Sequence, residues 1–526
     1  MKKRFTSLVI LALAFCASAN AQWNTSATPT QFINANNQGD YHVCSPKFAR
    51  TSDGKTWISY KTWDSHKVND STYYSDGVHT YLQLLDANGR TVFADPVSLN
   101  ANYQTPSWWS DYGLAVDKDG NAIVTVADSR SEEVPDSIDP SDYSSHQAFQ
   151  PAIYKVDQNG NLLWGLDGIS YPKYQDAPFT NVYVIGDDTY FQFTEISDSL
   201  VGTYLQRISS DGVPAWSEPK KLYGQLVPTT GTDFICFDDG GDGARATRYT
   251  RDLDQVWQVT YDSNSFGGHD LHPYKIATDG EGGAAVAFVR NMGQYAHNIR
   301  VQHISADGET TFGLTGIDAY GEEAYDHDYC DIAVNPKNKE ILVNWEDKIN
   351  DDENQTVGKF NYDGDRLWGN TGIAMGTKTG VAYSWGTVGQ TALADSSWIV
   401  AYTDVAKWAD MSLIVKRLDA NGKQIWKKTI GRSINVDDPQ VFSDAEWTYV
   451  FWRESKSGAE GINGIRIHNT DGKYVSDGTT TGISSASTKT INAVSYYTLD
   501  GRRINIPQHG INIAKYADGR TVKFIK

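Results

Sequence analysis

A turn followed by a large aromatic side chain recurs eight times along this chain. The turns carry Asp-Gly or a close variant and lie at residues 86–89, 157–160, 210–212, 252–254, 306–308, 362–364, 419–422 and 470–472. A ring follows each turn within a few positions, as Phe93, Trp164, Trp216, Trp257, Phe312, Trp368, Trp426 and Tyr474. A signature that returns about every 50 residues indicates a chain built from repeated structural units.

The copy at residues 391–431 shows what one unit contains. A short apolar strand at 390–394 is followed by a β-branched and aromatic run at 398–404, a third run at 413–418 and a return at 423–426. Four antiparallel strands of this size make one propeller blade. The sequence therefore predicts an all-β chain whose body is an eight-bladed β-propeller, with seven blades as the alternative. A β-sandwich would not explain why the signature repeats.

The recurring rings are expected to pack between neighbouring blades. Fully burying such a side chain is worth about 1.5 to 3 kcal/mol, which favours a packing role over stacking on a ligand. Residues 23–36 are expected to add an outer strand to the last unit and so close the ring.

The first 21 residues predict a signal peptide. Lys2, Lys3 and Arg4 form a basic end, residues 8–17 an apolar run, and residues 19–21 a small-x-small cleavage site. No other apolar run approaches the ~20 residues of a transmembrane helix, so no transmembrane segment is expected.

The propeller is assigned to residues 22–475. The net charge of −19 disfavours nucleic acid as a partner.

Three cysteines remain after the signal peptide: Cys44, Cys236 and Cys330. They fall in the first, fourth and sixth units, which a ring holds apart, and they lack the paired spacing of a zinc site. The sequence predicts three free, buried thiols.

The composition changes after Val475. Residues 476–490 are rich in Ser, Thr and Gly and are typical of a flexible linker. Residues 491–526 contain an Asp-Gly-Arg turn at 500–502, a Gly-Ile-Asn-Ile strand at 510–513 and a final strand ending in Lys. This order resembles the C-terminal sorting domain of type IX secretion cargo. The resemblance implies recognition by the type IX secretion machinery and delivery to the cell surface or the medium. It places the sorting signal on Gly501, Arg502, Gly510, Gly519, Lys523 and Lys526. The other interpretation is a small extra β-hairpin packed on the propeller.

The body resembles secreted bacterial propellers whose repeats carry a Leu-Asp-x-x-Gly-x-x-x-Trp signature. That resemblance concerns architecture, and propellers of this kind differ widely in function. Residues 52–57 also resemble the Asp-box turn of sialidases, but only in one shortened copy.

In a propeller, the segments that lead into the innermost strands and the loops that join the second strand to the third share one face, here named the loop face. Polar and aromatic residues gather in these segments, and a site is expected there. The catalytic candidates are His269, His272, His327 and Asp328, and the imidazoles of neighbouring units are expected to converge. The binding candidates are Asp40, His42, Trp109, Asp111, Asp270, Asp326, Arg290, Glu346 and Arg453.

Several chemistries fit these residue types. Carboxylates around a channel mouth suit Ca²⁺, although no cofactor is otherwise predicted. Carboxylates and imidazoles also suit acid–base catalysis on a sugar, and the same residues can simply cap strand starts. No nucleophile elbow or phosphate-binding loop is present.

The leading hypothesis is an exported binding or scaffold module for a glycan or an envelope protein. The alternative is a carbohydrate-active enzyme, either a glycoside hydrolase or a polysaccharide lyase.

Overall fold

The computed structural model describes residues 22–36, 42–69, 72–100, 103, 105, 110–130, 149–197, 199–238, 243–262, 274–293, 296–322, 326–349, 352–376, 388–407, 410–433, 435–456, 459–474, 495–498, 502–504, 511–515 and 521–525. Within these ranges all regular secondary structure is β-strand, and no helix is present. The chain divides into two compact units, Met1–Tyr474 and Val475–Lys526.

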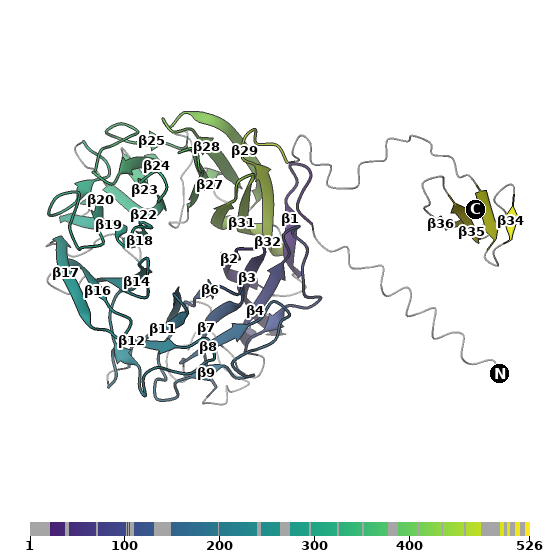
Figure 1. Ribbon diagram of the computed structural model, residues 1–526, viewed down its shortest axis with the longest axis horizontal. Coiled ribbons are helices and arrows are strands. Elements are labelled where there is room, and N and C mark those ends of the chain that lie inside the picture. The colour runs from purple at the N-terminus through teal and green to yellow at the C-terminus, as the bar shows by residue number, and fades with distance from the viewer. Residues whose placement is uncertain are drawn as a thin grey trace. The chain divides into compact units, whose positions relative to one another are not determined.

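The first unit is a ring of eight four-stranded antiparallel sheets, which Figure 1 shows arranged around a central axis. Blades 1 and 2 contain β2 (His42–Arg50), β3 (Thr56–Asn69), β4 (Thr72–Leu85) and β5 (Val97–Ser98), then β6 (Leu114–Val116), β7 (Ala122–Asp128), β8 (Gln150–Val156) and β9 (Ile169–Ser170). Blades 3 and 4 contain β10 (Phe179–Ile185), β11 (Asp188–Glu195), β12 (Gly202–Ile208) and β13 (Lys220–Lys221), then β14 (Gln225–Pro228), β15 (Phe234–Asp238), β16 (Ala244–Tyr249) and β17 (Gln255–Asp262).

Blades 5 and 6 contain β18 (Tyr274–Thr278), β19 (Ala284–Gly293), β20 (Ala296–Ile304) and β21 (Ile317–Asp318), then β22 (Asp326–Asn335), β23 (Glu340–Ile349), β24 (Asp352–Asn361) and β25 (Ile373–Ala374). Blade 7 contains β26 (Gly389–Ala392), β27 (Trp398–Lys407), β28 (Asp410–Leu418) and β29 (Gln424–Ser433). Blade 8 contains β30 (Asn435–Ser443), β31 (Trp447–Lys456), β32 (Ala459–His468) and β1 (Thr30–Asn36). The predicted eight-bladed propeller is confirmed.

The ring closes within blade 8, where the N-terminal strand β1 pairs antiparallel with β32. The backbone N–H of Arg466 also donates to Asn24 Oδ1 at 2.7 Å. The innermost strands β30 and β2 are in contact, which completes the circle. The expectation that residues 23–36 close the ring is therefore confirmed.

Each repeated turn is built by a side chain that accepts hydrogen bonds from its own backbone. Asp86 Oδ1 accepts from the N–H of Asn88 at 2.9 Å and of Arg90 at 2.8 Å, and Gly89 takes a φ of 77°. Such an Asx turn explains why Asp, Asn or Ser lies three residues before Gly in most copies of the signature. The fourth unit lacks the glycine, and Leu253 takes the positive φ of 73° instead.

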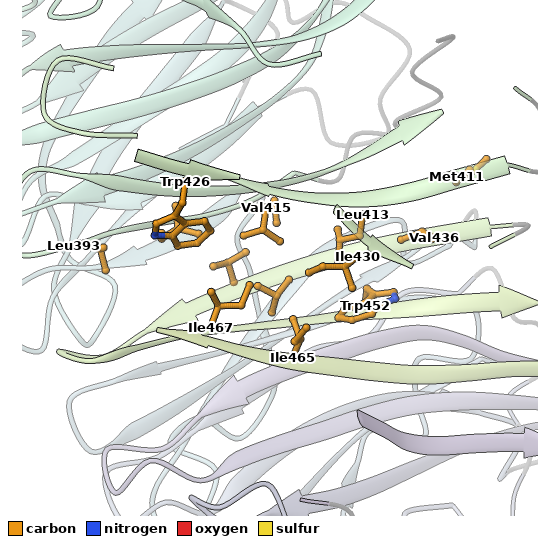
Figure 2. Packing of buried hydrophobic residues seen from close by; sticks show 14 residues of the cluster. Leu393, Met411, Leu413, Val415, Trp426, Ile430, Val436, Trp452, Ile465 and Ile467 are labelled. Carbon is orange, nitrogen blue, oxygen red and sulfur yellow. The ribbon is translucent and has the colours of Figure 1, made fainter. Parts of the chain in front are cut away.

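The aromatic rings after the turns pack between blades, as predicted. The indole N–H groups of Trp257, Trp368 and Trp426 each donate at 2.9 Å to a carbonyl in the turn of the following blade. Figure 2 shows Trp426 between blades 7 and 8, in a cluster with Val415, Ile430 and Ile467. Each blade interface thus has its own apolar core.

The eighth ring is not the one that the sequence predicted. Trp23 is buried and donates its indole N–H to the carbonyl of Ala87 at 3.1 Å, so it packs against the first blade's turn. Tyr474 instead packs beside the cluster that contains Trp426, and Lys428 Nζ lies 5.2 Å from its ring. The assignment of Tyr474 as the eighth ring is wrong because β1, and not the segment after residue 472, occupies the outer position of blade 8.

The innermost strands of blades 1, 6 and 8 share a β-bulge at the same level. The register shifts between Cys44 and Lys47, between Asp328 and Asp331, and between Asp437 and Gln440. Bulges of this kind re-aim side chains and are frequent next to functional sites. Among the described residues, Cys44, Cys236 and Cys330 form no disulfide, as predicted, but Cys44, beside the first bulge, is only partly buried.

The second unit contains one four-stranded sheet in the order β34 (Arg503–Ile504), β33 (Ser495–Thr498), β35 (Ile511–Lys515) and β36 (Thr521–Ile525). Within it, Arg502 is exposed and its carbonyl accepts from the N–H of Thr498 at 2.9 Å. Lys523 lies opposite Ile513 in the register of β35 and β36. Gly501, Gly510, Gly519 and Lys526 lie outside the described residues, and the sorting function stays a prediction.

Candidate functional site

Much of the predicted loop-face site falls where the structure gives no side chains. His269, His272, Asp270, Asp40 and Trp109 lie outside the described residues. For His42, Asp326 and Asp328 the structure describes only the backbone. It places His42 at the start of β2, and Asp326 and Asp328 within the first three residues of β22. The predicted convergence of imidazoles therefore stays a prediction.

Arg453 and Asp437 form an ion pair on blade 8. They face each other across β30 and β31, and Arg453 Nη2 contacts Asp437 Oδ2. Arg453 Nη1 also donates to the carbonyl of Val43 in blade 1 at 3.2 Å, while the N–H of Val43 donates to Glu460 Oε2 at 2.9 Å. The predicted binding residue Arg453 thus links the last blade to the first.

A second ion pair involves β2, the bulged inner strand of blade 1 that also contains Val43. Lys47 Nζ of blade 1 is 2.9 Å from Asp111 Oδ1, which belongs to the segment leading into blade 2. Burial acts to raise the pKa of Asp111, but the charge of Lys47 and its hydrogen bond outweigh it, and the pKa is lowered. The side chains stay 31% and 42% exposed, so both remain available to a ligand.

Lys61 lies behind this pair and is almost fully buried. Its ammonium donates to the carbonyl and to the hydroxyl of Ser110, the latter at 2.9 Å, and lies 5.2 Å from the centre of the Tyr112 ring. Burial lowers the pKa of Lys61 to about 8, against the opposite influence of Cys44 and Asp111. We refer to Lys47, Lys61, Asp111, Asp437 and Arg453 together as the loop-face cluster.

His327 is buried inside blade 6. Its side chain is 1% exposed, and Nδ1 lies 2.9 Å from Oδ1 of Asp347, the residue opposite it on β23. The ring of Tyr320 lies 4.9 Å from its own. A ligand therefore cannot reach this imidazole in the conformation that the structure shows.

Two further binding candidates lie on other blades. Glu346 is 3% exposed on β23. Arg290, on β19, has its Nε 3.3 Å from Oδ2 of Asp262 at the end of β17, so it joins blades 5 and 4. The structure therefore brings Asp111 and Arg453 into one region around blade 1 and leaves Arg290 and Glu346 apart from them.

A pocket of about 870 Å³ opens at the opposite end of the ring, where the first strand of each blade turns into the second. It is lined by residues of blade 1 (50–54 and 87), blade 7 (391) and blade 8 (441–444 and 449). We call it the seam pocket because it spans the place where the ring closes. Its volume falls in the range of small-molecule sites, about 300 to 1,000 Å³.

The charges around the seam pocket compensate one another. The guanidinium of Arg50 lies 3.7 Å above the ring of Tyr449, and its Nη2 donates to Asp444 Oδ2 at 3.3 Å. Asp53 pairs with Lys55 at 2.8 Å, and the hydrogen bond from Lys55 lowers the pKa of Asp53. No lining charge is left without an opposite partner.

Sequence reasoning missed the seam pocket. Its residues come from three blades, and the first and seventh are far apart along the chain. One signal was present, since the Asp-box-like turn at residues 52–57 supplies part of the wall. Lys47 and Lys61 were missed as well, because lysines within strands have no motif of their own.

The described residues contain no group of three or more His, Cys, Asp or Glu side chains arranged to hold a metal ion. In the same part of the chain, no helix has the length and apolar character needed to cross a membrane.

No protein-family model and no curated protein matches the chain. Among solved structures it is similar to a protein of unknown function from Dyadobacter fermentans, at 11% identity over 83% of this chain and 98% of that one, with a TM-score of 0.37. It is also similar to the polysaccharide lyase Uly1, at 9% identity over 86% and 100%, with a TM-score of 0.36. A third is the β-propeller domain of the Trilobed protease from Pyrococcus furiosus, at 8% identity over 82% and 97%, with a TM-score of 0.36. These likenesses do not bear on function.

Proposed function

We propose that this chain is an exported β-propeller that acts as a binding module for a glycan or an envelope protein, delivered by type IX secretion. The loop-face cluster is the observation that carries this proposal. Its partly exposed members are two cations, Lys47 and Arg453, and two carboxylates, Asp111 and Asp437, which come from blades 8, 1 and 2 around a bulged inner strand, with Lys61 buried behind them. Such paired charges offer both donors and acceptors to a polar ligand.

The test is binding to a polysaccharide panel by the full chain and by a Lys47→Ala variant. Lys47 is 31% exposed, so its removal is expected to preserve folding and to weaken glycan binding by about tenfold, the effect of losing one charge-assisted hydrogen bond. Lys173→Ala is the matched control, because Lys173 lies in the segment leading into β10 on the same face and pairs with Glu218 at 3.2 Å. Equal binding by the wild type and the Lys47 variant would contradict the assignment of this face.

A second candidate function, a carbohydrate-active enzyme, is favoured by Lys61. A lysine whose pKa is lowered to about 8 can exchange protons near neutral pH, and it lies close to Asp111 and the Tyr112 ring. This candidate predicts turnover of a polysaccharide, seen as new reducing ends or as unsaturated uronate absorbance. Turnover should disappear in Lys61→Met and depend on a group titrating near pH 8. Loss on replacing His269 or His327 by Ala, with Lys61→Met active, would place catalysis on the histidines instead.

A further inference from the structure

The wall of the seam pocket contains both hydrogen-bond donors and hydrogen-bond acceptors. Thr391 Oγ1 and Ser443 Oγ lie 3.2 Å apart, and Ser443 Oγ also lies 3.2 Å from the carbonyl of Ala392. When Ser443 donates to that carbonyl and Thr391 donates to Ser443, the lone pairs of Thr391 remain free to accept from a ligand.

Arg50 supplies the complementary donor. Its Nη2 is engaged by Asp444, whereas Nη1 is buried and has no hydrogen-bond partner among the residues that the structure describes. A buried donor without a partner is unfavourable, and a ligand oxygen that accepted from Nη1 would relieve this.

The pocket lacks the surplus positive charge that an anion would need. Arg50 is balanced by Asp444, and the remaining carboxylate, Asp53, by Lys55. The whole chain carries a net charge of −19, which also repels anions. Phe442, a partly exposed ring in the wall, adds an apolar surface. The pocket thus offers hydroxyl acceptors, the Nη1 donor of Arg50 and the aromatic ring of Phe442, and its charges cancel. These features match an uncharged sugar, whose hydroxyls both donate and accept.

We propose that the seam pocket binds an uncharged sugar residue of a glycan. This site lies at the opposite end of the ring from the loop-face cluster and does not depend on it. Binding there is coupled to ring closure, because the wall residues Ala87 and Tyr449 are held by Trp23, which donates to the Ala87 carbonyl and whose ring lies 5.1 Å from that of Tyr449.

The test is titration calorimetry of the full chain with uncharged hexasaccharides of glucose, mannose, xylose and N-acetylglucosamine, and with hexagalacturonate as the anionic probe. We expect saturable binding of at least one uncharged probe and none of hexagalacturonate at this site. Thr391→Val, which keeps the side-chain volume and removes the hydroxyl, should weaken that binding about five- to tenfold.

Asp53→Asn is the second variant, and Asp187→Asn is its matched control. Asp187 lies in the corresponding turn of blade 3 and pairs with Lys118 at 2.8 Å, as Asp53 pairs with Lys55. Asp53→Asn should weaken binding and Asp187→Asn should not. The proposal is overturned if no uncharged probe binds, if Thr391→Val binds like the wild type, or if hexagalacturonate competes for the same site. A failure here is distinct from a failure of the loop-face site, because this test measures the effects of Thr391→Val and Asp53→Asn whereas the loop-face test measures the effect of Lys47→Ala.

Discussion

The repeated turn brings the backbone of one blade against the ring of the blade before it. A Cβ built on Gly212 would lie 2.7 Å from Cδ1 of Trp164, and the residue has a φ of +83°. Two separate demands therefore fix glycine at this position. One is the left-handed backbone, and the other is the space that the neighbouring indole takes.

The two demands can be separated with Gly165, whose φ is +89° but whose Cβ would meet nothing within 4 Å. We expect Gly165→Ala to lower the free energy of unfolding by about 1 to 2 kcal/mol, the cost of the backbone conformation alone. Gly212→Ala should lower it further, because the Trp164 ring must also move. Urea unfolding of both variants measures the difference. Equal losses would show that the blade contact adds nothing.

Asp279 ties blade 5 to blade 6 and gives stability that depends on pH. Its Oδ1 accepts from the N–H of Glu281 and Gly283, and its Oδ2 lies 3.1 Å from His303 Nε2, whose ring stacks on Tyr362 of blade 6. Burial acts to raise the pKa of Asp279, but the hydrogen bonds outweigh it and the pKa is lowered. The folded state therefore binds its proton less tightly than the unfolded state does, for which the pKa is about 3.9.

The stability from Asp279 is fully present above about pH 4 and is lost as pH falls through the lowered pKa of the folded state. Asp279→Asn should be less stable at neutral pH and should show a shallower loss of stability on acidification. Thermal unfolding from pH 3 to 7 measures both. Glu309→Gln, at an exposed turn position, serves as the control and should follow the wild type. If the stability of Asp279→Asn fell on acidification as steeply as that of the wild type, the role assigned here would be contradicted.

At the scale of the strand, the N-terminal segment completes the last blade. Trp23 is 4% exposed, and its ring lies 5.1 to 5.5 Å from those of Phe32, Tyr449 and Phe451. This one segment thus supplies both the outer strand β1 and the eighth ring.

Trp23→Ala is expected to lower the free energy of unfolding by about 3 to 5 kcal/mol, the usual cost of removing a buried tryptophan. Tyr474→Ala should cost much less, because Tyr474 is only partly buried and lies outside the seam contact. Scanning calorimetry of the two variants distinguishes which ring closes the propeller. A larger loss in Tyr474→Ala would restore the assignment made from the sequence.

The repeated elements were predictable because each blade carries its own local pattern. The run at residues 398–404 has the β-branched and aromatic content of a buried strand, and the turn at 419–422 has the residues that such turns require. Tyr474 was misassigned because the repeat was read in order along the chain, whereas the eighth ring comes from the other end of the sequence. The seam pocket was not predictable, since Arg50, Thr391 and Asp444 meet only after the ring has closed.

At the scale of the whole molecule, the propeller and the C-terminal sheet are separate compact units. Deleting residues 475–526 should therefore leave the thermal unfolding of the propeller unchanged. The same deletion should stall delivery after export, with the protein retained in the periplasm, if the tail is a type IX sorting signal. Calorimetry and cell fractionation check the two outcomes. Unaltered surface delivery of the truncated chain would contradict the sorting function.

The antiparallel pairing of β1 with β32 joins partners more than 400 residues apart, as the bond from Arg466 to Asn24 shows with its separation of 442. Contacts of such sequence separation form late, because the intervening chain must first be ordered. Until then β32 is an edge strand with unpaired backbone groups. At high concentration that edge can accept the N-terminal strand of another copy, so domain-swapped dimers are the expected misassembled product of refolding.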